Sequence, residues 1–212
     1  MSDTLPPSPG AVKLLLDKGF NPSSVEFSRG EALRWAARTD ANVELVRLLL
    51  REGADVDSKD ANGGTALHSA ALAGACDVLG VLGAAKANVA GKCDLGRTAL
   101  HYAVMGRSCE AVRLLVNGLG SNLSWRDNLG STPLHSAANH GFNEVIQLLR
   151  DLGADIHEED DSGFTAIQYA SGWANVETVQ LLVELGSDIA EESKSGSTSL
   201  HAAAQHNKAE IA

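Results

Sequence analysis

Thr65-Ala66-Leu67-His68 is the most informative tetrapeptide of this sequence, because close copies of it recur along the chain. The copies are Thr98-Ala99-Leu100-His101, Thr132-Pro133-Leu134-His135, Thr165-Ala166-Ile167-Gln168, Thr198-Ser199-Leu200-His201 and a degenerate Glu31-Ala32-Leu33-Arg34. Successive copies start 34, 33, 34, 33 and 33 residues apart. Self-similarity at a fixed period of this size indicates a repeat protein, in which each unit packs on its neighbours.

Each unit has the same internal order. A short helix is predicted to open at the threonine, followed by a glycine-containing loop and a second helix. The second helix ends in a leucine pair, at Leu48-Leu49, Leu114-Leu115, Leu148-Leu149 and Leu181-Leu182. Three of these pairs precede Gly-Ala-Asp or Gly-Ser-Asp, whose glycine supplies the left-handed residue that stops a helix. A polar segment with another glycine then leads into the next threonine.

This pattern resembles the ankyrin repeat family, which has a period of about 33 residues and a T-P-L-H-x-A signature. The resemblance covers residues 11 to 212. It implies an all-α solenoid of helix-turn-helix units with projecting β-hairpin loops. It also implies a non-catalytic protein-protein interaction module that binds a protein partner through the concave helix face and the hairpin tips.

The repeat register divides the chain into a flexible leader and one ankyrin repeat domain. The leader is residues 1–10, where three prolines disfavour a helix. The domain, residues 11–212, comprises a half repeat at 11–30, repeats starting near 31, 65, 98, 132 and 165, and a truncated repeat from 198. Two explanations of the truncation stand: a fragment of a longer protein, or a natural chain with a frayed end. The first favours an alternative function, as the regulatory or targeting segment of a larger multidomain enzyme, channel or signalling protein.

The repeat that starts near residue 65 departs from this pattern. Its second helix contains Gly80 and Gly83, each of which costs up to about 1 kcal/mol relative to alanine. Lys86 stands where the helix-ending glycine belongs, at a further cost of about 1 kcal/mol if it takes the left-handed conformation. The alternatives are neutral drift in a stable array and a hinge or local unfolding site near residues 78–90.

The exposed side of the first helices is the main candidate binding surface. A helical wheel at about 100° per residue puts Leu67, Ala70 and Ala71 on the buried side. The opposite side collects two of the three tryptophans and both tyrosines, residue types that are frequent in binding hot spots. The alternative is that these rings pack along neighbouring first helices. The predicted binding residues are Trp35, Arg38, Leu72, Tyr102, Met105, Asn139, His140, Tyr169 and Trp173.

The hairpin tips are a second candidate surface, with Trp125 and Phe164 as predicted binding residues. Trp125 could instead tuck back on the adjoining hairpin. Residues 157–161 and Glu191-Glu192 carry much of the acidity of residues 107–212, which hold 6 basic and 15 acidic side chains. These tips are either solvated loops or a surface that attracts a basic partner.

The histidines are predicted to be structural. Four of the seven, His68, His101, His135 and His201, occupy the same repeat position, where hydrogen bonds to the hairpin backbone and to the opening threonine are expected. These four histidines do not cluster. The pairs His135/His140 and His201/His206 are five residues apart, whereas metal-binding helices use spacings of three or four. The sequence therefore predicts no metal, no cofactor and no catalytic residue: the chain is not expected to be an enzyme.

Composition excludes further classes of function. The formal net charge of −10 argues against nucleic-acid binding, and no apolar run approaches the roughly 20 residues of a membrane span. Three cysteines without a CxxC pair, and an N-terminus unlike a secretory signal, predict an intracellular, cytoplasmic protein, with the nucleus possible. Cys93 replaces the usual hairpin aspartate and is the cysteine expected to be exposed.

Overall fold

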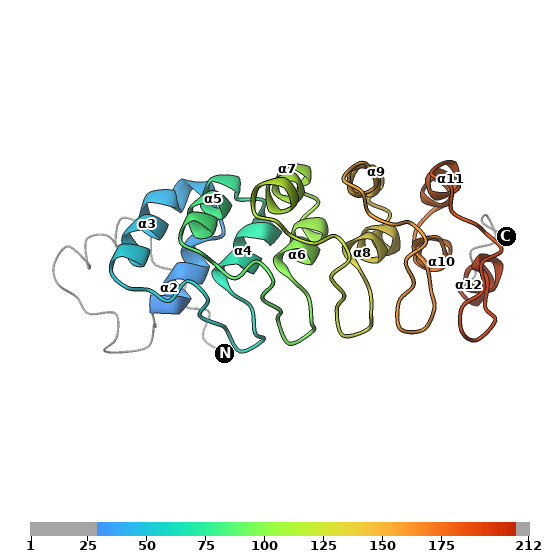
Figure 1. Ribbon diagram of the computed structural model, residues 1–212, viewed down its shortest axis with the longest axis horizontal. Helices are drawn as coiled ribbons and strands as arrows, with labels where there is room; N and C mark the ends of the chain where they lie inside the picture. Colours follow the sequence, from blue (N-terminus) through green and yellow to red (C-terminus); the bar gives the residue numbers. More distant parts are fainter. Residues whose placement is uncertain (1–28, 207–212) are drawn as a thin grey trace.

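The computed structural model describes residues 29–206, in which two layers of helices stack along one axis (Figure 1). The layer of first helices comprises α2 (Arg29–Ala36), α4 (Ala66–Ala73), α6 (Ala99–Met105), α8 (Pro133–His140), α10 (Ala166–Trp173) and α12 (Ser199–Gln205). The layer of second helices comprises α3 (Val43–Arg51), α5 (Cys76–Ala84), α7 (Cys109–Arg113), α9 (Asn143–Asp151) and α11 (Val176–Glu184). A 3-10 turn, η1 (Asp40–Asn42), precedes α3, and a π-helical turn, η2 (Leu114–Gly118), continues α7. The predicted leader and most of the predicted half repeat lie outside the described residues.

The recurrent threonine determines where each first helix begins. Thr65 is the N-cap of α4, and its backbone is extended there. Its side chain accepts from the backbone of His68 while the His68 ring accepts from the Thr65 N–H, so two helix-terminal donors are satisfied. The same reciprocal cap opens α6, α8, α10 and α12. The predicted helix starts are therefore confirmed for these repeats.

The core lies between the two layers and is built from alanine and leucine. Leu67, Ala70 and Ala71 are at most 1% exposed, as the helical wheel predicts. Small side chains at the last two positions let α4 and α6 approach closely. The second member of each leucine pair is equally buried, for example Leu115 and Leu149 at 0%. Full burial of one such leucine stabilises the fold by roughly 1.5–3 kcal/mol.

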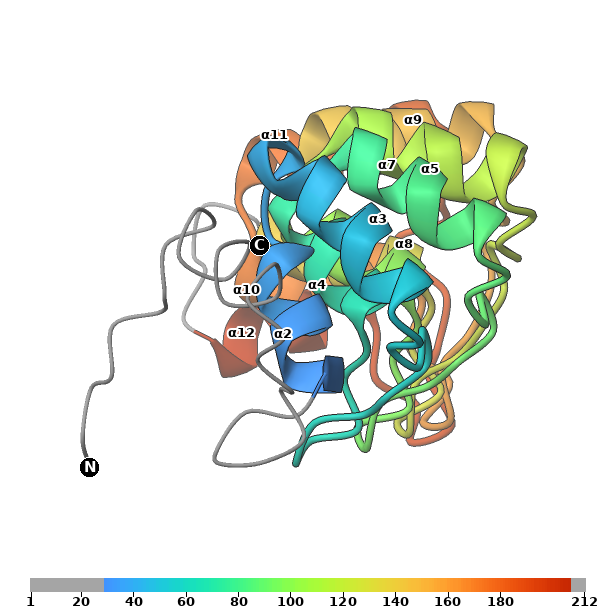
Figure 2. The ribbon, with the colours of Figure 1, turned by 90° about the vertical axis from the view of Figure 1, so that its left-hand side faces the viewer.

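Loops between successive repeats project from the edge of the first-helix layer (Figures 1 and 2). In the first complete loop, the Asp60 N–H donates to the Gly64 carbonyl over 2.9 Å, and the Asp60 carboxylate accepts from the N–H groups of Asn62 and Gly64. Adjacent tips are joined as well: the Asp94 N–H donates to the Asn62 carbonyl over 3.0 Å. The loops thus have hairpin-type turns, although no strand is assigned within residues 29–206.

The repeat that starts near residue 65 has an intact second helix, although its sequence departs from the repeat pattern. Helix α5 runs continuously through Gly80 and Gly83, and Lys86 has a left-handed backbone, with φ at 65°. The two glycines differ in their surroundings. A Cβ at Gly80 would meet nothing within 4 Å, whereas a Cβ at Gly83 would collide with the side chain of Leu119. The hinge near residues 78–90 stays a prediction.

The different surroundings of Gly80 and Gly83 predict different effects of alanine substitution on the free energy of unfolding. Gly80→Ala is expected to raise the free energy of unfolding by up to about 1 kcal/mol, because it only removes the backbone freedom of glycine. Gly83→Ala is not expected to raise the free energy of unfolding, because the new methyl group displaces the side chain of Leu119. Urea denaturation followed by circular dichroism measures both. Equal stabilisation by the two substitutions would contradict the packing described for Gly83.

Candidate protein-binding surface

All nine predicted binding residues on the first helices reach the surface. We call the surface that they form the inner face. Trp173 is 48% exposed and Leu72 is 45% exposed, and both are among the largest exposed apolar side chains of residues 29–206. Arg38 and His140 are also exposed. The side chains that are half-buried are Trp35, Tyr102, Met105, Asn139 and Tyr169.

The two tyrosines of the inner face serve largely to hold neighbouring repeats together. Tyr102 meets the ring of His68 edge-on, with ring centroids 5.0 Å apart, and Tyr169 meets His135 in the same way at 5.4 Å. The Tyr169 hydroxyl donates to the Asp160 carboxylate over 2.7 Å. Burial raises the pKa of Tyr169 to about 12, with a further contribution from its hydrogen bond to Asp160. For these two rings, the contacts favour the alternative of packing against the neighbouring repeat.

Trp173 differs from the tyrosines because much of its ring remains open to solvent. Its centroid lies 5.6 Å from that of Tyr169 and 4.3 Å from that of His206 in the next repeat. On the hairpin side, the ring centroid of Phe164 lies 6.3 Å from that of Tyr169. The four rings therefore form a continuous aromatic strip from a hairpin loop across α10 to the end of α12. An apolar ring body with a polar N–H is suited to contact a protein partner.

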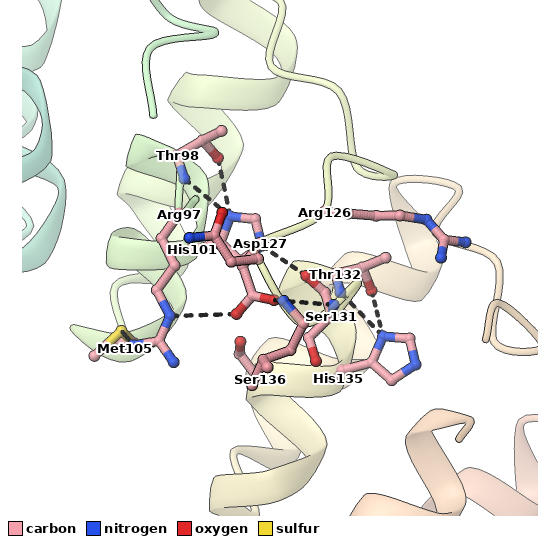
Figure 3. A network of polar contacts seen from close by, with 12 residues as sticks. Arg97, Thr98, His101, Met105, Arg126, Asp127, Ser131, Thr132, His135 and Ser136 are labelled. Carbon is pink, nitrogen blue, oxygen red and sulfur yellow. Dashed lines mark hydrogen bonds and ion pairs between the residues drawn. The ribbon is translucent and has the colours of Figure 1, made fainter. Parts of the chain in front are cut away.

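The repeated histidines form the polar network that supports this surface (Figure 3). The Nδ1 atom of His101 accepts from the Thr98 N–H over 3.2 Å and lies 3.0 Å from the Thr98 hydroxyl. Its Nε2 atom lies 3.1 Å from the Ser131 carbonyl of the next repeat. This arrangement requires the neutral tautomer with hydrogen on Nε2. The predicted bonds to the threonine and to the hairpin backbone are confirmed here and at the equivalent His68 and His135.

Burial opposes protonation of these rings. Desolvation lowers the pKa of His101 to about 4, although the bond to Ser131 acts in the opposite direction. The pKa values of His68 and His135 are lowered for the same reason. The fourth member, His201, keeps its threonine contact but is exposed, and it has no partner on the next repeat within residues 29–206. Of the two copies without histidine, one has Arg34 and the other has Gln168, which reproduces both ends of the bridge, to Thr165 and Ser197.

The predicted binding residues of the hairpin loops are both half-buried. Phe164 packs against Tyr169, as described above. For Trp125, the structure gives one backbone contact, a 3.4 Å hydrogen bond from its N–H to the Asn122 carbonyl. The expectation that Cys93 is exposed is wrong, because Cys93 is only 6% exposed. It takes the inward-facing position of the hairpin aspartate and lies beside Tyr102, whose pKa is raised to about 12 by burial and by the Cys93 thiol.

The acidic hairpins are partly neutralised within the array. Lys59, Lys92 and Arg126 each donate to a backbone carbonyl of the following repeat, over 3.0, 2.7 and 2.7 Å. Arg126 also pairs with Glu158 at 3.2 Å. The Nδ1 atom of His157 lies 3.4 Å from a carboxylate oxygen of Glu191. Glu158 and Glu191, two of the carboxylates that could have attracted a basic partner, are therefore engaged in contacts between hairpins.

One hollow was not foreseen from the sequence. It lies on the second-helix layer, with a volume of about 390 Å³, and contains none of the predicted binding residues. It is lined by Arg47, Cys76, Asp77, Gly80, Val81, Ala84 and Leu114. The absence of a side chain at Gly80 is the sequence feature from which this hollow could have been predicted. Within residues 29–206, no three His, Cys, Asp or Glu side chains are grouped to hold a metal ion, and no helix has the length and apolarity of a membrane span.

The stacked helix pairs, the joined hairpin loops and the exposed inner face define a solenoid repeat protein. The family model for ankyrin repeats in three copies matches residues 7–91, 81–160 and 152–212. The chain belongs to the ankyrin repeat family. It is similar to "SH3 and multiple ankyrin repeat domains protein 1" of human, mouse and rat, with 43% identity over 72 residues in each. The match covers 34% of this chain and 3% of the length of those relatives.

Proposed function

We propose that this chain is a non-catalytic module that binds a protein partner through the inner face, with Trp173 and Leu72 as the main apolar contacts. The observation that carries the proposal is the exposure of these two large apolar side chains, 48% and 45%, on the inner face. A large exposed apolar ring lowers the solubility of a monomer, whereas burial in an interface stabilises a complex. Membership of a family of protein-interaction repeats supports the same role.

The proposal is tested by quantitative capture of partners from a lysate of the source cells. Trp173→Ala and Leu72→Ala, alone and combined, are expected to weaken capture of a specific partner by about tenfold or more, as hot-spot truncations do. Tyr169→Phe is expected to matter less for binding, because it removes only the hydroxyl that bonds Asp160. Isothermal titration with the purified partner then gives the dissociation constants.

A matched control is available on the second-helix layer. Val183 of α11 is 46% exposed, close to the value for Trp173, but lies away from the inner face. Val183→Ala is expected to leave capture unchanged. Partners that are retained by the folded Trp173→Ala/Leu72→Ala variant would contradict the proposal and would direct attention to Trp125 and the hairpin tips.

An alternative proposal is that the array acts as the regulatory or targeting segment of a larger multidomain enzyme, channel or signalling protein. It is supported by the relatives, in which the matched region is only 3% of the length. An immunoblot of the source cells tests it. A band near the 22.1 kDa of this chain would count against it, and a much larger band would favour it.

A further inference from the structure

The first-helix layer is almost free of charge. Helices α4, α6, α8, α10 and α12 contain no Asp, Glu, Lys or Arg, although these residues make up 21% of the chain. By contrast, every helix of the second layer carries an acidic residue in its first turn. Glu31 of α2 is the one acidic residue on the described first helices. The acidity of the molecule is therefore located on the second helices and the loops.

Three arginines lie on or beside the inner face. Arg38 is itself an inner-face residue and is exposed. Arg107 follows α6, and its guanidinium lies 5.0 Å from the centroid of the Phe142 ring, which stacks on His140 at 5.2 Å. Arg97 reaches in from a hairpin and donates to the sulfur of Met105 over 3.6 Å. Within residues 29–206, neither Arg38 nor Arg107 forms an ion pair.

The carboxylates of Asp127, Asp160 and Asp40 are already engaged in structural contacts. Asp127 and Asp160 are at most 8% exposed and accept hydrogen bonds from their own turns. Asp127 also lies 3.5 Å from Arg97, whose side chain remains 29% exposed. Asp40, close to Arg38 in sequence, accepts from the Val78 N–H over 3.0 Å. The inner face thus presents cationic and apolar groups in a molecule with a net charge of −10.

We infer that the partner segment bound by the inner face is acidic, an extended peptide with Asp or Glu side chains on Arg38 and Arg107 and apolar side chains on Leu72 and Trp173. The inference rests on the proposed function of the inner face. Guanidinium groups bind carboxylates with two parallel hydrogen bonds, which fixes orientation as well as register. Leu72, in the repeat between the two arginines, and Trp173, on α10, supply buried area that a purely ionic contact lacks.

The acidic hairpins also orient such a segment. Residues 155–161 contain Asp155, Glu159 and Asp161 in addition to the paired Glu158, so like charges would repel a carboxylate placed over that end of the array. Screening limits this repulsion to about 8 Å at physiological salt, so it acts locally and does not prevent association. The acidic part of the partner therefore lies over the repeats with Arg38 and Arg107, and the apolar side chain that contacts Trp173 lies over α10.

A peptide selection tests this inference without knowledge of the natural partner. Random 12-residue peptides displayed on phage are selected against the full 212-residue chain, and a selected peptide is synthesised with a fluorescent label. We expect selected peptides to be enriched in Asp and Glu next to Trp, Leu or Phe. Fluorescence anisotropy is expected to show about tenfold weaker binding to Arg38→Glu/Arg107→Glu.

A charge-matched control separates this effect from a change in net charge. Arg113→Glu/Arg150→Glu makes the same change on α7 and α9 of the second layer and is expected to bind within about twofold of the wild type. A second variant, Arg38→Gln/Arg107→Gly, guards against misfolding, because glycine suits the positive φ of 54° at residue 107. It is expected to weaken binding in the same direction, and circular dichroism confirms folding of each variant.

The outcomes distinguish this inference from the function on which it rests. Selected peptides that depend on Trp173 but are neutral or rich in Lys and Arg would overturn the acidic partner and leave the inner face as the binding site. Peptides that are insensitive to both Trp173→Ala and Leu72→Ala would overturn the inner face itself. Acidic peptides that bind both glutamate variants equally would also overturn the role of Arg38 and Arg107.

Discussion

Replacement of His101 with alanine is expected to lower the free energy of unfolding by about 3–5 kcal/mol. The imidazole is fully buried and joins three groups: the N–H and hydroxyl of Thr98 and the carbonyl of Ser131. Its removal leaves buried polar groups without partners, each at a cost of roughly 1–3 kcal/mol, and creates a cavity in addition. Urea denaturation at pH 7 measures the change.

The chain itself provides the control for this substitution. Gln168 occupies the equivalent position, accepts from the Thr165 N–H over 2.9 Å and donates to the Ser197 carbonyl over 2.8 Å. His101→Gln can reproduce both bonds and is therefore expected to retain most of the stability that His101→Ala loses. Equal destabilisation by alanine and glutamine would show that the shape of the imidazole matters and that the bridge does not.

Mild acid is expected to destabilise the array through the same histidines. The pKa of His101 is lowered to about 4 in the folded state, mainly by desolvation, against an ordinary value of 6.5. The unfolded chain therefore binds more protons between these two pH values, so stability rises with pH across that window and is fully present above it. His101 alone is expected to contribute a loss of about 2 kcal/mol between pH 7 and pH 5.

The glutamine variant isolates the contribution of His101. Carboxylates titrate equally in both proteins, so the difference between wild type and His101→Gln in the change from pH 7 to pH 5 belongs to His101. We expect His101→Gln to lose about 2 kcal/mol less than the wild type over this interval. The lowered pKa values of His68 and His135 act in the same direction and remain in the variant. Identical losses would contradict a neutral, buried His101 in the folded state.

Much of the fold could be predicted from the sequence because the decisive interactions are local or repeat at a fixed interval. The threonine caps its own helix, the alanines and leucines follow the helical period, and the histidine bonds groups within three residues and one repeat away. The left-handed conformation of Lys86 agrees with its register with the helix-ending glycines. Each of these features depends on the position within one unit.

The state of the individual side chains on the inner face was harder to predict. Helical spacing places Tyr169 and Trp173 on the same side of α10, but it does not reveal that Tyr169 bonds Asp160 while Trp173 stays nearly half exposed. Cys93 was misjudged because the residue type suggested nothing about the inward direction of the hairpin aspartate that it replaces. Such differences depend on contacts between repeats, and a single sequence records them only indirectly.

The histidine bridge links the stability of each repeat to that of the next. In each case the ring belongs to one repeat and the carbonyl belongs to the next, from His68 to Arg97 and from His135 to Phe164. Opening of a hairpin therefore removes a bond from the helix of the preceding repeat, and opening of that helix leaves the hairpin carbonyl without its donor. The bridge accordingly couples the two repeats equally in both directions. A partner that clamps a late hairpin would, by the same coupling, slow amide exchange in the helix before it.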